Sequence, residues 1–306
     1  MIQIENVSMT FKAKTGAEFK ALDGITIEIP DGSAYGFLGS NGAGKSTLMR
    51  MMTGIYPVRE GSIRIDGLDV FDNPEAKKNI FFVNDETVQY TSYTLDGLKN
   101  YYKVYYPDFS DTVFERILEK LHLPRDKRLS EFSKGMKRQA MVLIGLSCRT
   151  KYLMLDEAFD GLDPAMRKYV KNIITDEILD RDATLIVSSH NITEISEICD
   201  KAMLIHKGRL IFANDVDDIR SGFGKVQLVR SSKPVAPEEL ETLGLGVVKY
   251  ELVGSVVQAV IRADDNTLRE QLPKLGCEVC EMIGLTLEEI FIYEMEARGY
   301  ATDELA

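Results

Sequence analysis

The sequence predicts an α/β fold built around a phosphate-binding loop, with a small α+β unit after it. Three observations predict this. An apolar run before Gly39 is followed by G-x-x-x-x-G-K-S at 39–46 and then by a helical apolar pattern. Two later apolar runs, Tyr152–Asp156 and Thr184–Ser189, are typical of buried strands. After Phe212 the composition shifts. We therefore expect the 306 residues to form a large domain, 1–221, and a small one, 222–306.

The loop has the residue types that phosphate binding requires. Glycines let the backbone turn tightly and bring its N–H groups close to phosphate oxygens. A helix that starts near Lys45 directs the positive end of its dipole at the same anion. Lys45 offers a charge to the β- and γ-phosphates, and the Ser46 hydroxyl is a ligand for Mg²⁺. We expect a nucleoside triphosphate to contact Gly39, Ser40, Asn41, Gly42, Ala43, Gly44, Lys45, Ser46 and Thr47.

The composition is ordinary for a soluble globular protein, with 44% hydrophobic and 28% charged residues. The net charge of −11 disfavours sequence-independent binding of nucleic acid, which needs clustered positive charge. No apolar run approaches the roughly 20 residues of a membrane span. The first residues also lack the pattern of a secretory signal. We therefore expect a cytosolic protein.

The four cysteines indicate no disulfide framework in a cytosolic chain. Cys277 and Cys280 form a lone C-x-x-C, and a zinc site would need two more ligands nearby. A redox pair and two partly buried structural cysteines remain as interpretations.

Two strands are predicted before the loop, Ile2–Val7 and Ile25–Ile29, from their alternation of apolar and polar residues. Phe11, near the end of the first, could stack on a purine or pack within the strand. A turn then leads into the strand Ser33–Leu38, which enters the phosphate loop.

Beyond the loop, short strands are expected at 61–65 and 68–71, and a buried strand at 80–83. The pattern turns helical from about Leu95 to Leu146, which indicates a helical insert between two halves of a sheet. Its entrance is rich in tyrosine, a residue favoured both in packing and at partner-docking surfaces. These tyrosines are Tyr90, Tyr93, Tyr101, Tyr102, Tyr105 and Tyr106.

Polar side chains stand at the ends of the two later strands. Asp156, at the end of a strand in a phosphate-loop protein, suits the second Mg²⁺-holding position. Glu157 follows it and could polarise an attacking water. His190 stands after Ser189, where parallel α/β sheets present ligand-binding groups, so we expect it to touch phosphate.

The remainder, from about 222, carries no chemical motif. Short strands are expected at 225–230, 247–253 and 255–262, and helices at 268–275 and 285–297. This pattern predicts a small α+β domain.

In this order the motifs resemble the ATP-binding subunit of an ABC transporter, over about residues 1–220. GSNGAGKST is similar to the Walker A motif, and Leu153–Asp156 to Walker B. Phe132–Met136 stands where that family has its LSGGQ signature, and Asp160–Asp163 where it has its D-loop. The resemblance implies an ABC ATPase core with an antiparallel β subdomain and a helical subdomain at about 92–150.

The resemblance also implies roles for individual residues. Glu157 falls on the family's catalytic glutamate, and His190 on its switch histidine. Phe11 falls on the aromatic residue that stacks on adenine. Ser133 and Gly135 fall on the signature residues that contact the ATP held by the other subunit.

The family resemblance implies partners as well. Two subunits, either this chain twice or this chain with a related one, close head to tail around two ATP molecules and Mg²⁺, and drive transmembrane permease subunits. The S-K-G-M form of the signature looks like that of drug and antibiotic exporters with separate membrane subunits, and is similar to members encoded beside GntR-type regulators. Such a subunit is cytoplasmic and peripheral at the inner face of the membrane. The alternative is a soluble ABC ATPase without a membrane partner.

Two positions depart from the family pattern. Lys134 and Met136 replace the first glycine and the glutamine of the signature. The glutamine of the family's Q-loop would fall near Asp85, and Gln89 comes four positions late. We hypothesise that Asp85 takes its place beside Mg²⁺, because a carboxylate is a good ligand for a hard cation. The alternative is a solvated loop residue.

Overall fold

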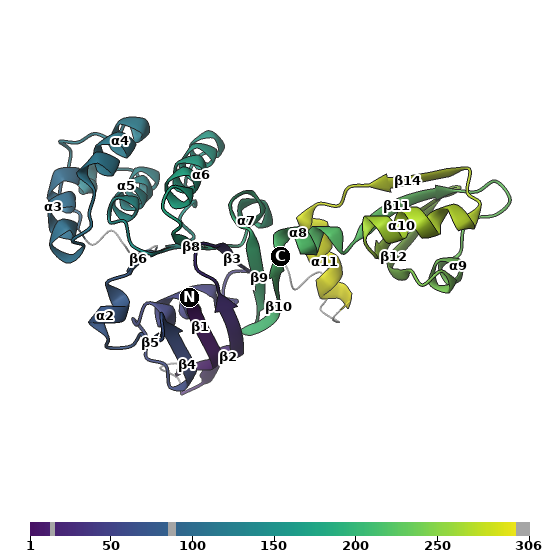
Figure 1. Ribbon diagram of the computed structural model, residues 1–306, viewed down its shortest axis with the longest axis horizontal. Coiled ribbons are helices and arrows are strands. Elements are labelled where there is room, and N and C mark those ends of the chain that lie inside the picture. The colour runs from purple at the N-terminus through teal and green to yellow at the C-terminus, as the bar shows by residue number, and fades with distance from the viewer. Residues whose placement is uncertain (13–15, 85–89, 298–306) are drawn as a thin grey trace. The chain divides into compact units, whose positions relative to one another are not determined.

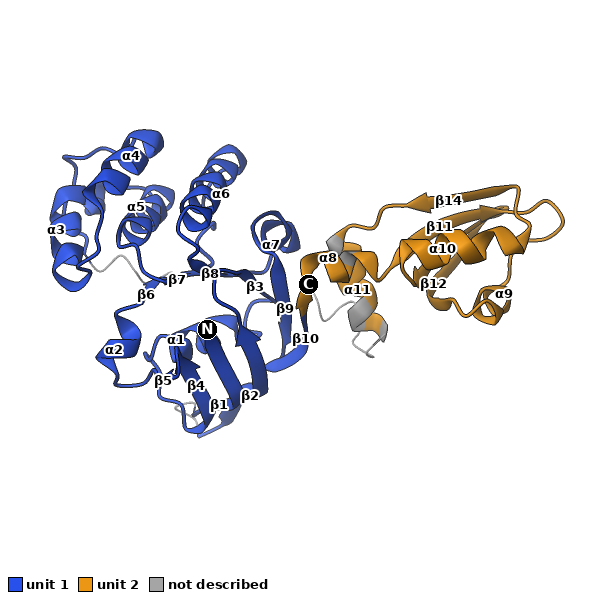
Figure 2. Cartoon of the chain, viewed as in Figure 1, with its two compact units in different colours: residues 1–213 blue, residues 214–306 orange. Residues whose placement is uncertain are grey.

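The computed structural model describes residues 1–12, 16–84 and 90–297. The chain divides into two compact units, Met1–Ala213 and Asn214–Ala306, which Figure 2 distinguishes by colour. The composition predicted a boundary after residue 221, but the structure divides the chain after Ala213. The reason is that helix α8 (Val216–Ser221) contacts helix α11 (Leu287–Ala297) of the second unit.

A six-stranded sheet in the order β10-β9-β3-β8-β7-β6 forms the centre of the first unit. Its strands are β3 (Ala34–Leu38), β6 (Ile80–Val83), β7 (Tyr152–Asp156), β8 (Thr184–Ser189), β9 (Lys201–His206) and β10 (Arg209–Asp215). The pairs β6–β7, β7–β8, β8–β3 and β3–β9 are all parallel. The carboxyl ends of these strands therefore meet at one edge, and the predicted α/β core is confirmed.

An antiparallel sheet in the order β2-β1-β4-β5 lies beside the central sheet (Figure 1). It shares one hydrophobic core with helix α1 (Lys45–Met52). Its strands are β1 (Ile2–Lys12), β2 (Glu18–Ile29), β4 (Glu60–Ile65) and β5 (Leu68–Asp69). The first two are longer than expected. They continue into polar residues because one face of an antiparallel sheet can remain in water.

The helical insert lies between β6 and β7 in the sequence, as predicted. It contains α3 (Leu95–Tyr105), α4 (Asp111–Leu121), the 3₁₀ turn η1 (Leu129–Glu131) and α5 (Lys134–Ser147), which Figure 1 shows grouped together. Three further helices complete the unit: α2 (Pro74–Lys77), α6 (Pro164–Leu179) and α7 (Ile192–Ile198). Helix α4 buries five residues at three- and four-residue intervals, which explains its amphipathic pattern. In the described part of the chain, no helix has the length and apolarity needed to cross a membrane.

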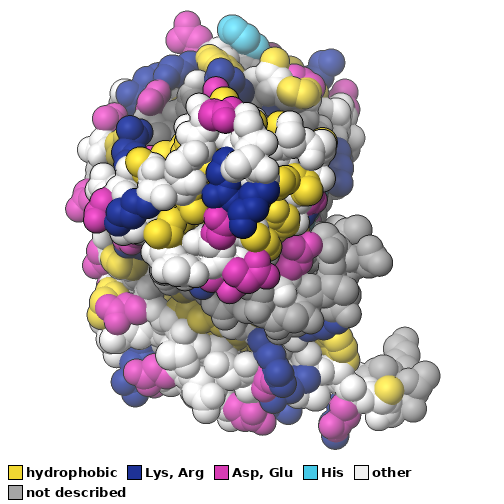
Figure 3. All heavy atoms as spheres, turned by 90° about the vertical axis from the view of Figure 1, so that its right-hand side faces the viewer, with side chains coloured by type: hydrophobic (Ala, Val, Ile, Leu, Met, Phe, Trp, Pro, Cys, Tyr) yellow, Lys and Arg dark blue, Asp and Glu magenta, His cyan; other side chains and the backbone are white. Residues whose placement is uncertain are grey.

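The second unit has its own core and an antiparallel sheet in the order β12-β13-β11-β14. After α8, its elements are β11 (Gly224–Val229), α9 (Pro237–Thr242), β12 (Gly246–Val253), β13 (Val256–Arg262), α10 (Asp265–Gln271), the 3₁₀ turn η2 (Leu272–Leu275) and β14 (Val279–Ile283). From β11 to β14 this is the βαββαβ arrangement of ferredoxin-like folds. On the face drawn in Figure 3, hydrophobic side chains lie among interspersed acidic and basic ones.

Strand β14 was not predicted, and helix α10 ends earlier than expected. The strand contains Cys280 and is largely exposed, so it lacks the apolar alternation that marks a strand. Cys277 and Cys280 are both free thiols, and burial raises the pKa of each. A raised pKa disfavours the thiolate form on which redox reactivity depends.

A polar cluster fastens the two sheets of the first unit at the amino-terminal end of β7. The Lys151 ammonium lies 2.8 Å from Asp31 and 2.6 Å from Asp66. The Tyr152 hydroxyl donates towards Asp31 at 2.8 Å and Asp66 at 2.7 Å. Partial burial raises the pKa of Asp31, but Lys151, the amino-terminal ammonium and the Tyr152 hydroxyl together lower it to about 2.

We predict that Asp31→Asn lowers the free energy of unfolding at pH 7, and that this deficit shrinks as the pH falls from about 4 towards 2. The pKa of Asp31 is depressed in the folded state, so its stabilisation is present above the unfolded pKa and is lost as the pH falls through the folded one. Urea unfolding over this pH range measures the effect, with the exposed Asp126→Asn as the control. A deficit that does not change with pH would contradict the electrostatic explanation.

Candidate functional site

The phosphate loop connects β3 to α1, and two of its glycines have no room for a side chain. A Cβ on Gly39, whose φ is +153°, would lie 2.2 Å from the Ile205 carbonyl oxygen. A Cβ on Gly44, whose φ is +115°, would lie 2.7 Å from the Ala21 carbonyl oxygen. Neighbouring strands thus hold the loop tightly. Asn41 and Gly42, at its tip, are exposed.

Lys45 lies between the loop backbone and the end of β7. Its ammonium donates to the carbonyls of Gly39 at 2.6 Å and Ser40 at 3.0 Å. It also lies 3.8 Å from a Glu157 carboxylate oxygen. Burial lowers the pKa of Lys45, and the carboxylates of Glu157 and Asp156 counteract this. The lysine charge is therefore held within a partly desolvated site, where it acts strongly on an anion.

Asp156 connects three elements through one carboxylate oxygen. The hydroxyl of Ser46, in the first turn of α1, donates to Oδ1 of Asp156 at 3.0 Å. The hydroxyl of Ser188 donates to the same oxygen, because Asp156 and Ser188 are register partners in the parallel pair β7–β8. The structure thus brings Ser46 and Asp156 together as the sequence predicted, whereas Ser188 was not predicted.

These two side chains fit a magnesium ion. A hydroxyl and a carboxylate are hard oxygen ligands, and Mg²⁺ commonly takes its other ligands from waters and substrate phosphates. No group of three or more histidine, cysteine, aspartate or glutamate side chains could hold a metal among the described residues. Asp85, the further ligand proposed from sequence, lies outside the described residues.

Glu157 has an unusual backbone conformation that fixes its direction. Its φ is +47°, a region costing a non-glycine residue on the order of 1–3 kcal/mol. Two side chains support the strained turn. Its N–H donates to the Ser188 hydroxyl at 3.0 Å, and its carbonyl accepts from the buried Arg138 of α5 at 2.6 Å. Arg138 was not among the predicted site residues; a buried arginine is rare without a partner, and here the partner is this carbonyl.

His190 follows β8 and is exposed. A buried network fixes the backbone on either side of it. The Ser189 hydroxyl donates to Glu194 at 2.6 Å and accepts from the Asn191 N–H at 2.9 Å. Glu194 in turn pairs with Arg167 of α6 at 2.7 Å. The backbone beside His190 is thus held by these contacts, while its imidazole is exposed.

Ser133 and Gly135 lie at the start of α5, and their environments differ. Ser133 is exposed and caps the helix, its hydroxyl accepting from the Met136 N–H at 3.2 Å. Gly135 is buried against the following loop. A Cβ there would lie 2.9 Å from the Gly161 carbonyl and 3.2 Å from a Leu162 methyl group. Gly135 therefore has a packing role within its own chain.

Phe11 lies near the end of β1 and is half-buried. It pairs across the ladder with Phe19 and contacts Tyr56 edge-on, with ring centroids 5.6 Å apart. Phe19 is 61% exposed, so the end of this hairpin presents two aromatic side chains. Both interpretations of Phe11, packing and stacking on a base, are compatible with this position.

Comparison with known proteins identifies the family. The family model described as ABC transporter matches residues 22–160. The energy-coupling factor transporter ATP-binding protein EcfA2 of Caldanaerobacter subterraneus is 30% identical over 260 residues, which cover 80% of this chain and 85% of that protein. The ABC transporter ATP-binding protein YtrB of Bacillus subtilis is 26% identical over 279 residues, covering 89% of this chain and 94% of that protein.

Solved structures of ATP-binding cassettes have the same fold as the first unit of this chain. The structure described as that of an ATP-binding subunit of an ABC transporter has a TM-score of 0.64 at 26% identity and covers 72% of this chain and 92% of that one. A dimeric structure of the ATP-binding cassette MJ0796 bound to ADP and Pi has a TM-score of 0.62 and covers 71% of this chain and 99% of that one. At 16% identity it supports the fold alone.

The fold and the matching residues define a phosphate-loop ATPase of the ABC cassette type. The chain belongs to the ABC transporter family as an ATP-binding subunit, and its enzymatic class is ATP hydrolase.

We predict that Gly135→Ala destabilises the protein by about 1–3 kcal/mol and lowers ATP turnover, because the new methyl group displaces the backbone at Gly161. Thermal unfolding and steady-state ATP hydrolysis measure the two effects. Gly246→Ala is the matched control, since its Cβ would have no atom closer than 3.7 Å. Equal stability of the wild type and Gly135→Ala would disprove the proposed packing role.

Proposed function

We propose that this chain powers an exporter whose transmembrane subunits are separate polypeptides. The coupling to a partner is supported by a pocket of about 480 Å³ beside the helical insert, where aromatic and aliphatic side chains lie together with polar ones such as Lys77 and Asn84. Export is favoured by the S-K-G-M signature and by relatives named for antibiotic transport. The bacitracin transport protein BcrA of Bacillus licheniformis is 32% identical over 196 residues, which cover 63% of this chain and 64% of that protein. The methionine import ATP-binding protein MetN of Pasteurella multocida is also similar, at 28% identity.

The pocket has the character of a docking surface. It lies where β6, the end of α1 and the tyrosine-rich helix α3 meet, and its lining is Thr53, Ile55, Lys77, Ile80, Phe81, Phe82, Asn84, Tyr90, Tyr102 and Tyr106. The rings of Tyr102 and Tyr106 pack on Phe81 with centroids 5.3 and 5.5 Å away. Ile55 remains 51% exposed at its rim. An apolar anchor from a partner would cover this surface, since aromatic side chains dominate interface cores.

The site residues have separate roles in the proposed reaction. Lys45 neutralises the β- and γ-phosphates, while the loop N–H groups from Gly39 to Thr47 hold their oxygens. Mg²⁺, held through Ser46 and Asp156, would supply charge stabilisation to the transferred phosphoryl group. Glu157 accepts a proton from the attacking water, and its supported backbone aims the carboxylate. His190 contacts the γ-phosphate, and Phe11 stacks on adenine.

The site of one chain is completed by a second chain. Ser133 is exposed at the amino-terminal end of a 14-residue helix, whose dipole favours an anion. It contacts the γ-phosphate bound to the partner, with Gly135 shaping the same turn. A head-to-tail pair, of two copies or of this chain with a related subunit, therefore encloses two ATP molecules. The pair is held at the inner membrane face through its permease.

The residues from 222 onward serve as an accessory or regulatory domain, since no proposed ATP contact comes from them. An association with GntR-type regulators stays a prediction from the signature. The alternative function is that of a soluble ABC ATPase without a membrane partner, and the pocket is the feature that argues against it.

Glu157→Gln should retain ATP binding and lower hydrolysis by about 10²–10⁴-fold, because a positioned base contributes that much to the rate. Single-turnover hydrolysis and equilibrium ATP binding measure the two steps, with the exposed Glu119→Gln of helix α4 as the control. Wild-type turnover by Glu157→Gln would remove Glu157 from this role.

A mixing experiment tests the shared site. Ser133→Asp keeps a good helix cap but places a carboxylate against the γ-phosphate, and Lys45→Ala removes the lysine charge. Each variant alone should be inactive. A one-to-one mixture should recover about a quarter of the wild-type rate if sites act independently, because half of the dimers have one intact site. No recovery, with mixed dimers shown to form, would contradict the arrangement unless both sites must be intact together. Ser133→Asn, which keeps the cap without the charge, serves as the control.

Ile55→Glu should abolish co-purification with a co-expressed membrane subunit while the basal ATP hydrolysis of the isolated chain stays near wild type. The charge would lie in the pocket that Phe81 and Tyr102 also line, where it would oppose the packing of an apolar side chain of the partner. Leu179→Glu is the matched control, because Leu179 is 75% exposed and does not line the pocket. If Ile55→Glu co-purifies as well as the wild type, docking occurs elsewhere on the protein. If no membrane subunit binds the wild type, the result favours a soluble ATPase.

A further inference from the structure

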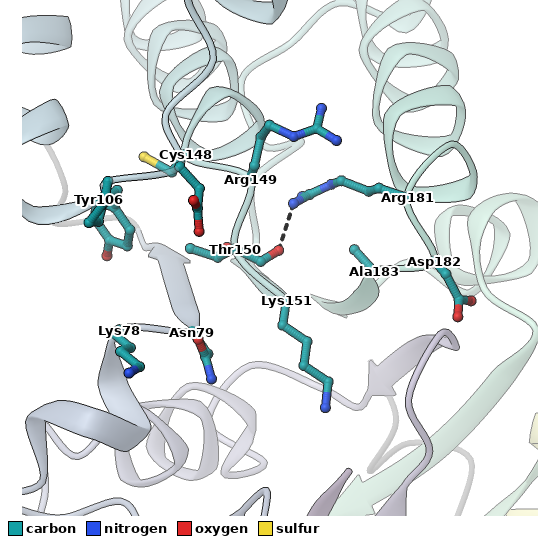
Figure 4. A pocket seen from close by; sticks show the side chains of 12 residues that line it. Lys78, Asn79, Tyr106, Cys148, Arg149, Thr150, Lys151, Arg181, Asp182 and Ala183 are labelled. Carbon is teal, nitrogen blue, oxygen red and sulfur yellow. Dashed lines mark hydrogen bonds between the residues drawn. The ribbon is translucent and has the colours of Figure 1, made fainter.

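A second pocket, of about 370 Å³, lies at the amino-terminal ends of the parallel strands, whereas the ATP site lies at their carboxyl ends. Figure 4 shows the side chains that line it. It is found where β6, β7 and β8 begin, whereas Asp156 and Ser188 lie where β7 and β8 end. Its lining is Lys78, Asn79, Tyr106, Pro107, Asp108, Cys148, Arg149, Thr150, Lys151, Arg181, Asp182 and Ala183. None of these residues has a part in the proposed reaction.

The lining is unusually basic for a chain of net charge −11. The lining contains two carboxylates, those of Asp108 and Asp182, and four cationic side chains, those of Lys78, Arg149, Lys151 and Arg181. Of the cations, Lys78 pairs with Glu75, and Lys151 pairs with Asp31 and Asp66 outside the pocket. The positive charge available to a ligand therefore comes chiefly from Arg149 and Arg181.

The guanidinium of Arg181 is held in a fixed orientation with one edge unused. Its Nη1 donates to the Thr150 carbonyl at 2.7 Å, the bond drawn in Figure 4. Its Nε and Nη2 are buried and have no hydrogen-bond partner among the described residues. These two nitrogens form the edge that binds two oxygens of an oxyanion in parallel. An unpaired buried donor is costly, so this edge is a site that a ligand would satisfy.

Arg149 brings a second positive charge to the same place. It follows α5 with a φ of +52°, a left-handed conformation, and its side chain is exposed. Burial and the neighbouring Arg149 lower the pKa of Arg181 to about 10, although the charge of Glu177 counteracts this, so Arg181 remains protonated at neutral pH. The carboxyl ends of α5 and α6 also favour cations nearby, but a dipole does not satisfy the N–H groups of Arg181.

We propose that this pocket binds the phosphate group of a small phosphorylated molecule. Arg181 binds two phosphate oxygens through Nε and Nη2, and Arg149 moves aside to admit the group and then balances its second charge. A dianion matches two arginines better than a carboxylate does, because it pairs with both charges. The pocket volume leaves room for the molecule that carries the phosphate.

Inorganic phosphate is the probe, and Lys45→Gln is the background because the phosphate loop also binds phosphate. Isothermal calorimetry should find one remaining site in Lys45→Gln. Adding Arg181→Gln should weaken binding at that site by tenfold or more, since two charge-assisted hydrogen bonds are lost. Adding the exposed Arg149→Gln should weaken it as well. Adding Arg64→Gln, which removes an equal charge outside the pocket, should change nothing, and acetate at the same ionic strength should bind far more weakly.

Three results would overturn the proposal. One is no phosphate binding by Lys45→Gln up to about 10 mM, a range in which even a weak specific site is detectable. The others are binding unaffected by both arginine substitutions and acetate binding equal to that of phosphate. Circular dichroism verifies folding, and if Arg181→Gln does not fold, the Arg149→Gln comparison decides. Any of the three results would leave the two arginines with a structural role only, as cations near the carboxyl ends of α5 and α6.

Discussion

The site depends on one carboxylate oxygen, Oδ1 of Asp156, which accepts hydrogen bonds from Ser46 and Ser188. This oxygen joins the first turn of the phosphate-loop helix to the ends of two neighbouring strands. The parallel register makes the contact possible, because it places Asp156 and Ser188 side by side on neighbouring strands. Ser46 and the backbone of Glu157 are both positioned at this junction.

Glu157 illustrates how the junction extends. The same Ser188 hydroxyl accepts the Glu157 N–H, while Arg138 holds the Glu157 carbonyl from the helix that Ser133 caps. The backbone strain at Glu157 is thus supported from two sides. Because Gly135, in the first turn of the same helix, packs on Gly161, the signature turn and the loop after Glu157 are coupled within one chain. A movement of the signature helix would therefore change the direction of the carboxylate that we propose as the base.

Much of this could be predicted from the sequence, since the informative residues carry local constraints. The phosphate loop needs glycine at particular positions, and the buried strands β7 and β8 are continuous apolar runs, so their ends were predictable. Ser188 and Glu194 were missed because a serine or a glutamate near a strand end has no pattern of its own. Their roles arise from strand register and from a helix packed on the sheet. Strand β14 was missed for the opposite reason, since its exposure removes the apolar signal. The tyrosines near the insert were left open between packing and docking, and in the structure Tyr102 and Tyr106 pack on Phe81 while also lining a pocket.

The most direct test of the account is the rate of Mg²⁺-dependent ATP hydrolysis by Asp156→Asn relative to wild type. Asparagine has the same shape and can still accept from Ser46 and Ser188, so the junction should survive while the charge that holds the metal is lost. We predict a loss of about 100-fold or more in turnover with an unchanged melting temperature. Turnover near the wild-type rate, with the same dependence on Mg²⁺ concentration, would contradict the central claim that this carboxylate organises the ATP site.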